Sequence, residues 1–106
     1  MESIIPGYYY HYKHDPSISI NNFAYRVLGI GLHTEDDCLE IDKYMVVYRP
    51  LYDTFAYRNG KMYDLRPLKI FVSPASKNGK LVDRYVKITD PEIIKTLEEI
   101  QRNMYE

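Results

Sequence analysis

Residues 24–32, AYRVLGIGL, combine aromatic, β-branched and other apolar side chains over nine positions, a composition typical of a strand in a sheet. Residues 44–52, YMVVYRPLY, have the same character, and Pro50 marks an edge, a bulge or a strand end because proline cannot donate to the ladder. Gly29 and Gly31 stand two positions apart and therefore lie on one face. Paired glycines in a strand indicate tight curvature or the close approach of another backbone. Both features favour a small, closed or strongly curved sheet.

Turn signals divide the rest of the chain up to residue 88 into short strands. Asn59-Gly60 and Asn78-Gly79 each predict a hairpin, because both positions of a tight hairpin turn need positive φ. Residues 15–22 contain Pro16 and two asparagines, which predicts a loop. The other expected strands are 8–14, 55–58, 61–64, 65–73 (interrupted by Pro67), 72–77 and 80–88.

The spacing of the apolar residues changes after residue 89 from a strand pattern to a helical one. Asp90 followed by Pro91 predicts the start of a helix. An apolar stripe at helical spacing follows, formed by Ile93, Ile94, Leu97, Ile100 and Met104. We therefore expect one domain over residues 1–106, mainly β. It is predicted to be a small SH3-like barrel or a strongly bent antiparallel sheet over 7–88, with a C-terminal α-helix over 90–105.

Length and charge limit the range of functions. A chain of 106 residues and 12.6 kDa has room for one core and not for two domains or a dinucleotide fold. The net charge of −1 argues against strong non-specific binding to nucleic acid or to acidic membranes. No apolar run is long enough to span a bilayer, and residues 1–7 do not resemble a signal peptide. The single cysteine, Cys38, excludes an internal disulfide, so a reducing compartment, the cytoplasm, is expected.

Three features of the sequence do not indicate a specific chemical function. The acidic segment 35–42 does not match a calcium loop and is expected to be a solvated loop. Cys38 lies beside Asp36 and Asp37, which would raise its pKa and weaken it as a nucleophile. The histidines have no neighbouring metal-ligand motif and no Gly-rich phosphate loop is present, so neither metal nor cofactor is predicted.

Polar side chains near the predicted strand ends form the candidate ligand site. His11 and Lys13 share a face of one strand and Tyr12 points the other way, while His33 and Glu35 have the same two-residue spacing. If a closed sheet gathers these strand ends, cationic and imidazole groups would suit an anion. The candidate residues are His11, Tyr12, Lys13, His33, Glu35, Tyr48, Arg49 and Arg66. Alternatively, Glu35 forms a buried ion pair with Arg49 or Arg66 that only ties the sheet together.

Tyrosine is unusually frequent, with 12 residues, and often stands beside a basic residue. Tyrosines suit the half-buried surface of a sheet, but rings beside cations are also typical of single-strand nucleic-acid binders. Residues 58–87 are predominantly basic, whereas residues 31–42 are acidic. A basic hairpin face could therefore contact phosphates or the acidic segment of a second copy, and the C-terminal helix is another possible dimer contact.

Several blocks resemble a known family. Residues 7–13 (GYYYHYK) are similar to G-x-Y-x-H-Y-K, and residues 25–35 (YRVLGIGLHTE) to Y-x-V-L-G-x-x-x-H-[ST]-E. Residues 46–52 (VVYRPLY) resemble V-V-Y-R-x-L-Y, residues 65–71 (LRPLKIF) resemble V-R-P-L-x-M-F, and Arg84-Tyr85 stands in place of a closing R-F. These blocks resemble a small, mostly bacterial family catalogued as domain of unknown function 1653. The resemblance implies a compact, mainly β domain and carries over no activity.

The sequence departs from the family pattern in three places. It has extra residues between Lys13 and Tyr25, an acidic insertion after Glu35 and an inserted hairpin around Asn59-Gly60. The helix after Thr89 lies outside the pattern. We expect a non-catalytic binding module that recognises an anionic small ligand or peptide. The alternatives are binding of a single-stranded nucleic acid or nucleotide through basic hairpins and tyrosines and, least favoured, a hydrolase with His11 or His33 as general base and Glu35 as its orienting group.

Overall fold

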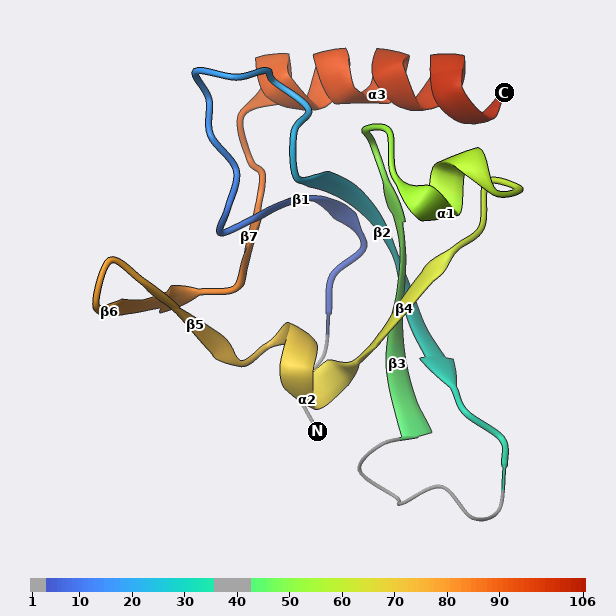
Figure 1. Cartoon of the computed structure of the whole chain (residues 1–106). Coiled ribbons are helices and arrows are strands. Elements are labelled where there is room, and N and C mark those ends of the chain that lie inside the picture. The colour runs from blue at the N-terminus through green and yellow to red at the C-terminus, as the bar shows by residue number, and fades with distance from the viewer. Residues whose placement is uncertain (1–3, 36–42) are drawn as a thin grey trace.

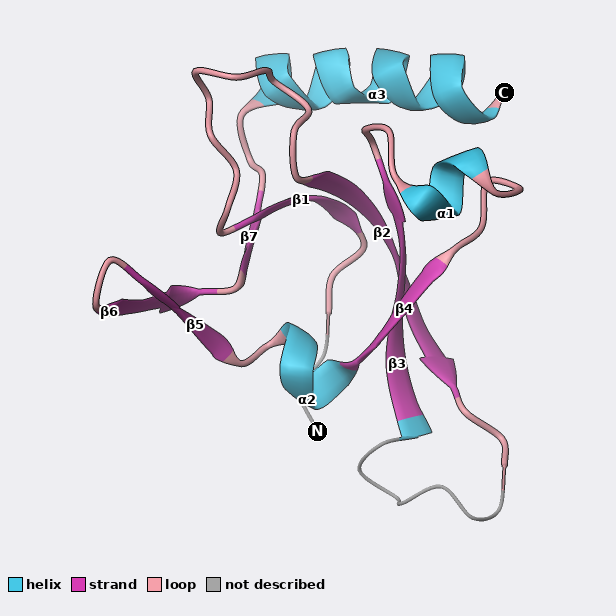
Figure 2. Ribbon diagram, in the orientation of Figure 1, coloured by secondary structure: helices cyan, strands magenta, loops and turns pink. Residues whose placement is uncertain are grey.

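A computed structural model of the chain describes residues 4–35 and 43–106 and is mainly β (Figure 1, Figure 2). Its elements in chain order are β1 (Gly7–His11), β2 (Ala24–Leu32), β3 (Tyr44–Pro50), α1 (Phe55–Arg58), β4 (Asp64–Pro67), α2 (Leu68–Phe71), β5 (Pro74–Lys77), β6 (Lys80–Asp83), β7 (Tyr85–Lys87) and α3 (Pro91–Tyr105). Most of the predicted acidic loop and all of Cys38 fall within residues 36–42, which lie outside the described residues.

Five strands form one antiparallel sheet in the order β4-β3-β2-β1-β7. The edge strands β4 and β7 do not pair with each other in the described chain, so the sheet is strongly bent but is not a closed barrel. The expectation of a bent antiparallel sheet with a C-terminal helix is thereby confirmed. Strands β5 and β6 form a separate hairpin that projects away from the main sheet (Figure 1).

The glycines of β2 lie where the sheet departs from regular geometry. The register between β2 and β3 shifts between Val27 and Gly29, and Gly29 has a φ of 154°. A Cβ at Gly31 would lie 3.2 Å from Cγ2 of Val47 on β3. The close neighbour at Gly31 is thus the side chain of Val47 and not another backbone, whereas Gly29 lies at the irregularity of the sheet.

The two faces of the sheet carry separate hydrophobic clusters, because successive side chains of a strand point to opposite faces. We call the face that packs against α2 the inner face and the face that packs against α3 the outer face. The inner cluster consists of Tyr9, Tyr25, Val27, Val46, Tyr48, Leu68 and Phe71. The outer cluster consists of Tyr8, Ala24, Leu51, Ile88 and Leu97. Tyrosine thus supplies much of the core on both faces.

Helix α3 begins and packs as its sequence predicts. The carboxylate of Asp90 accepts a hydrogen bond from the backbone N–H of Glu92 at 2.9 Å, and Pro91 occupies the first turn. Leu97 is fully buried against the outer cluster, with Ile93, Ile94 and Ile100 partly buried beside it. At the sheet, the hydroxyl of Tyr8 donates to Oε1 of Gln101 at 2.6 Å. The helix therefore packs on the outer face of the sheet (Figure 1).

The hairpin predicted around Asn59-Gly60 is wrong. Residues Phe55–Arg58 form the short helix α1, because the hydroxyl of Thr54 caps its start by accepting from the backbone N–H of Tyr57 at 3.3 Å. Asn59 is the C-cap, and Gly60, with a φ of 98°, turns the chain away from the helix. Gly60 does adopt the positive φ that was predicted, but it follows the end of a helix instead of joining two strands.

Two predicted strands are shorter than expected. The strand over 65–73 stops at Pro67, and Leu68 and Phe71 point into the inner cluster from helix α2. The strand over 80–88 is divided at Arg84, since β6 pairs with β5 whereas β7 pairs with β1. The hairpin at Asn78-Gly79 is confirmed, with φ of 52° and 78°.

Candidate functional site

Seven aromatic rings gather on the inner face of the sheet. We call this group the tyrosine cluster; it consists of Tyr25, Tyr48, Tyr52 and Tyr85 with Phe23, Phe71 and His11. Five of its rings form a closed series with consecutive centroids 5.1–6.0 Å apart: His11, Phe23, Tyr52, Tyr25 and Tyr85. Tyr25 and Tyr48 are buried, whereas Phe23, Tyr52, Tyr85 and His11 are only partly buried. The tyrosine cluster therefore continues from the core to the surface.

Strand alternation explains why these side chains meet. Tyr85 of β7 lies opposite His11 of β1, and Tyr48 of β3 lies opposite Val27 of β2, which follows Tyr25 by two residues on the same face. Phe71 enters from α2 and stacks on Tyr85 with a centroid distance of 3.9 Å and an interplanar angle of 4°. Four strands and one helix thus contribute to a single aromatic surface.

Strand β4 adds two charged groups to the same surface. Asp64 lies opposite Tyr48, and Arg66 lies opposite Val46, so both point to the inner face. Nε of Arg66 donates to the hydroxyl of Tyr48 at 3.1 Å. Arg66 forms no ion pair with Asp64 or with any other carboxylate among residues 4–35 and 43–106. Its guanidinium therefore has free N–H groups beside the aromatic rings.

Two tyrosine hydroxyls of the cluster are hydrogen-bonded to each other. The hydroxyls of Tyr25 and Tyr52 lie 2.5 Å apart. This pair needs only one of its two protons, so the other proton can be donated elsewhere. Burial, reinforced by neighbouring tyrosines, raises the pKa of Tyr25 and Tyr85 far above the ordinary value. The hydroxyls consequently stay protonated and act as donors.

Electrostatics on the inner face favour a negatively charged partner. Burial, together with the charges of Lys13, Arg66 and Arg84, lowers the pKa of His11 from 6.5 to about 4. The imidazole is therefore neutral at pH 7, and its Nδ1 accepts from the backbone N–H of Lys13 at 3.1 Å, which leaves the ring proton on Nε2. Asp64 partly offsets the positive charges; burial raises the pKa of its carboxyl, and Arg66 opposes that effect.

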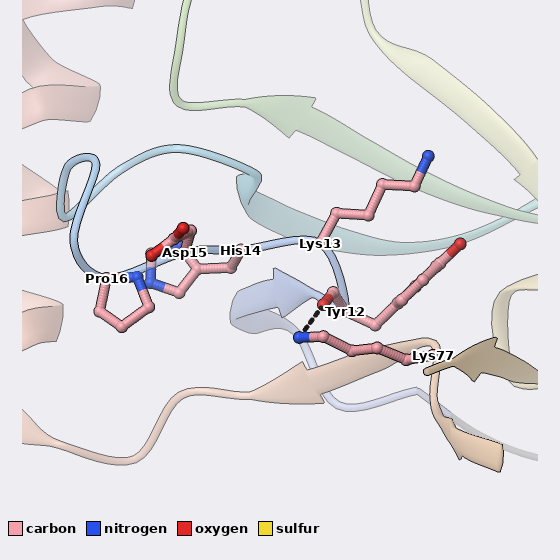
Figure 3. A pocket seen from close by; sticks show the side chains of 6 residues that line it. All are labelled: Tyr12, Lys13, His14, Asp15, Pro16 and Lys77. Atoms are coloured by element: carbon pink, nitrogen blue, oxygen red, sulfur yellow. Dashed lines mark hydrogen bonds between the residues drawn. The ribbon is translucent and has the colours of Figure 1, made fainter. Parts of the chain in front are cut away.

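Tyr12 and Lys13 lie just beyond the tyrosine cluster. The Tyr12 ring centroid is 4.4 Å from that of His11, and both Tyr12 and Lys13 line a shallow pocket of about 410 Å³. Figure 3 shows this pocket, in which Nζ of Lys77 donates to the backbone oxygen of Tyr12 at 3.0 Å. The other lining residues are His14, Asp15 and Pro16. The pocket extends the surface of the tyrosine cluster towards two lysines.

Arg49 lies on the opposite side of the sheet from the residues just described. Its guanidinium carbon lies 3.9 Å from the ring centroid of Tyr105 on α3 and 4.3 Å from that of Tyr63, and Nη2 donates to the backbone oxygen of Lys61 at 3.0 Å. This arrangement attaches the C-terminal end of α3 to β3. Arg49 therefore does not join Arg66 at a common rim, and that part of the expected convergence is wrong.

His33 and Glu35 also lie away from the other candidates. They follow the end of β2, opposite the start of β3, whereas His11 lies beside Phe23 at the other end of β2. The contact between them is from the backbone N–H of Glu35 to Nδ1 of His33 at 3.3 Å, so the carboxylate does not orient the imidazole. Glu35 forms an ion pair with neither arginine in the described chain. The structure thus brings together His11, Tyr12, Lys13, Tyr48 and Arg66 and separates the other three candidates.

Six members of the surface were absent from the sequence-based site: Phe23, Tyr25, Tyr52, Asp64, Phe71 and Tyr85. The alternation of side chains along a strand could have indicated two of them. Tyr25 and Tyr85, like Tyr48, each stand beside a basic residue that points to the opposite face. Asp64 could not be assigned, because residues 61–64 were expected to close a hairpin that does not form.

The described residues give no sign of a metal centre or of a membrane segment. Among residues 4–35 and 43–106, no three His, Cys, Asp or Glu side chains come together as metal ligands. No helix in the part of the chain that the structure describes combines the length and apolar character needed to cross a bilayer.

The fold and this surface define a small, strongly bent antiparallel β domain with a tyrosine-rich inner face and a C-terminal helix. The family described as protein of unknown function (DUF1653) matches residues 7–87, and the chain belongs to that family. The match covers β1 to β7 and ends before α3. No curated protein and no solved structure matches the chain.

Proposed function

We propose that the domain is a non-catalytic binding module whose inner face recognises an anionic group carried by an apolar or aromatic body. The observation that carries this proposal is Arg66, a partly buried guanidinium bonded to a tyrosine hydroxyl and unpaired with any described carboxylate. A guanidinium in this situation can bind a carboxylate or phosphate through two parallel hydrogen bonds.

Further features support an anion carried by an apolar body. A hydroxyl proton of the Tyr25–Tyr52 pair is available for donation, as is Nε2–H of His11. The neutral rings of Phe23 and Tyr52 are partly exposed and offer contact to an apolar body. An aromatic surface can also bind a cation, but Arg66, Lys13 and Arg84 act on His11 as positive charges and disfavour that choice.

Binding of single-stranded nucleic acid has weaker support. That function needs exposed rings on which bases stack. Tyr25 and Tyr48 are buried, and Tyr85 is stacked on Phe71. The predicted cytoplasmic location stays a prediction, as does the absence of catalysis.

An NMR titration of the ¹⁵N-labelled protein with benzoate, acetate and inorganic phosphate tests the proposal. We expect benzoate to shift the amides of β4 and β7 and to bind more tightly than acetate, because only benzoate adds a ring. The variant Arg66→Met should weaken benzoate binding at least tenfold. The matched control is Arg58→Met, since Arg58 is exposed and paired with Asp53 at 3.3 Å.

Two results would overturn the proposal. One is the absence of shifts on β4 and β7 with any of the three anions while the protein stays folded. The other is an equal loss of benzoate affinity in Arg58→Met and Arg66→Met, which would mean that binding depends only on the net charge of the protein. If a thymidine oligonucleotide binds and none of the three anions shifts the amides of β4, the result would favour the nucleic-acid alternative instead.

A further inference from the structure

Half of β2 is an open sheet edge. Strand β3 pairs with β2 from Tyr25 to Leu32, with a register shift between Val27 and Gly29, but β1 pairs only with the first four residues of β2, and the last pair joins Gly7 to Val27. Residues 28–32 therefore have no strand partner on their second side within the described chain. Their backbone groups on that side can be satisfied only by water or by another strand.

The other strand edges carry features that discourage association. Strand β4 has four residues, includes two charged side chains and ends in Pro67, and β7 has three residues and ends in Lys87. The β5–β6 hairpin carries Lys77, Lys80 and Asp83. Short length, charge and proline are the usual protections of an exposed edge.

Residues 28–32, which we call the open window, lack these three protections, and the register shift between Val27 and Gly29 lies at the start of the window. Their sequence, LGIGL, contains neither charge nor proline. The side chains of Leu28, Ile30 and Leu32 are 42%, 36% and 62% exposed. An apolar strand edge of this kind is expected to pair with another strand.

We propose that the open window pairs antiparallel with the open window of a second copy, about a two-fold axis at Ile30. The sequence LGIGL is the same in both directions, so this register places Leu28 opposite Leu32 of the partner subunit and Gly29 opposite Gly31 of the partner subunit. Each position thus meets a residue of matching size, and no charges are brought together. A self-complementary patch of this kind is what a two-fold interface requires.

The length of the open window fits pairing with a second copy of the same strand. In the proposed register, the partner's strand ends at Leu32 opposite Leu28, next to the point where β1 begins to pair with β2. The pairing is remote from Tyr25 along β2 and leaves the tyrosine cluster uncovered.

The contact is short, so the dimer should be weak. Five residues of strand extend over about 17 Å, much less than the interface of a stable complex requires. We expect the mass measured by sedimentation equilibrium to rise from 12.6 kDa towards twice that value as the protein concentration is raised from about 10 µM to about 1 mM.

Substitutions in the open window separate this interface from others. Ile30→Lys places two lysines against each other on the axis and should weaken association at least tenfold, and Leu32→Lys should have a similar effect at a more exposed position. Leu81→Lys is the matched control, because Leu81 is 76% exposed on β6 and is not in the open window. Far-UV circular dichroism establishes that each variant is folded, and Leu32→Lys serves if Ile30→Lys is not.

A wild-type mass that stays at 12.6 kDa up to about 1 mM would overturn this proposal. So would a folded Leu32→Lys variant that associates as strongly as the wild type. Loss of association in Leu81→Lys alone would place the contact on the basic hairpin face, as one of the sequence-based expectations has it.

Discussion

The free energy of unfolding should fall as the pH is lowered from about 6.5 to about 4 because of His11. Burial and the charges of Lys13, Arg66 and Arg84 lower the pKa of His11 from 6.5 to about 4. Between these values the unfolded chain binds a proton that the folded chain does not bind, so acid favours unfolding. The full shift corresponds to about 3 kcal/mol. Because the ring is partly exposed and its charges are screened by solvent, we expect roughly 1–2 kcal/mol.

Urea denaturation at pH 7.0 and pH 4.5 measures this effect when the wild type is compared with His11→Asn. Asparagine keeps an acceptor for the backbone N–H of Lys13 but does not titrate, so losses due to carboxyl groups are common to both proteins. The wild type should lose roughly 1–2 kcal/mol more than the variant between the two pH values. Equal losses in both proteins, or an NMR titration of His11 near pH 6.5, would refute the electrostatic description of the inner face.

Three further predictions concern the fold. Leu97→Ala should lower the free energy of unfolding by about 2–4 kcal/mol in urea denaturation, because Leu97 lies fully buried on the face of α3 that packs against the sheet. The exposed Lys95→Ala should change it by less than about 0.5 kcal/mol, and similar values for both would mean that α3 is not docked. Tyr105→Leu should lower the thermal midpoint, because it removes the ring that stacks on Arg49 and the hydroxyl that donates to the backbone oxygen of Pro50. A loss in the double variant with Arg49→Met that is smaller than the sum of the two single losses would support the stacking contact, whereas additive losses would contradict it. Gly79→Ala should cost about 1 kcal/mol because residue 79 has a φ of 78°, and an unchanged free energy of unfolding would argue against the tight turn.

The sequence was sufficient for the elements whose signals are local and regular. Strand β2 has the predicted bounds, and α3 follows from the Asp90-Pro91 start and its apolar stripe. The Asn78-Gly79 turn joins two strands, but Asn59-Gly60 follows a helix instead. Glycine near a turn needs positive φ in both cases, so the dipeptide alone cannot distinguish the two structures.

The candidate site was predicted only in part, because it depends on which strand ends meet. Antiparallel pairing places His33 beyond the last residue of β2 and His11 beside its first residue, so they cannot share a rim. Arg49 and Tyr48 are neighbours in sequence and therefore lie on opposite faces. Arg66 lies two residues from Asp64 and shares its face, an arrangement that became clear only once β4 had been paired with β3.

A crystal of the wild-type protein soaked with 4-iodobenzoate tests the anion-binding account most directly, because the anomalous signal of iodine locates the ring. We predict iodine beside the partly exposed rings of Tyr52 and Tyr85, with the carboxylate bonded to Arg66, and no such signal in Arg66→Met. Iodine in the pocket between Lys13 and Lys77, or at the same site in Arg66→Met, would contradict the account.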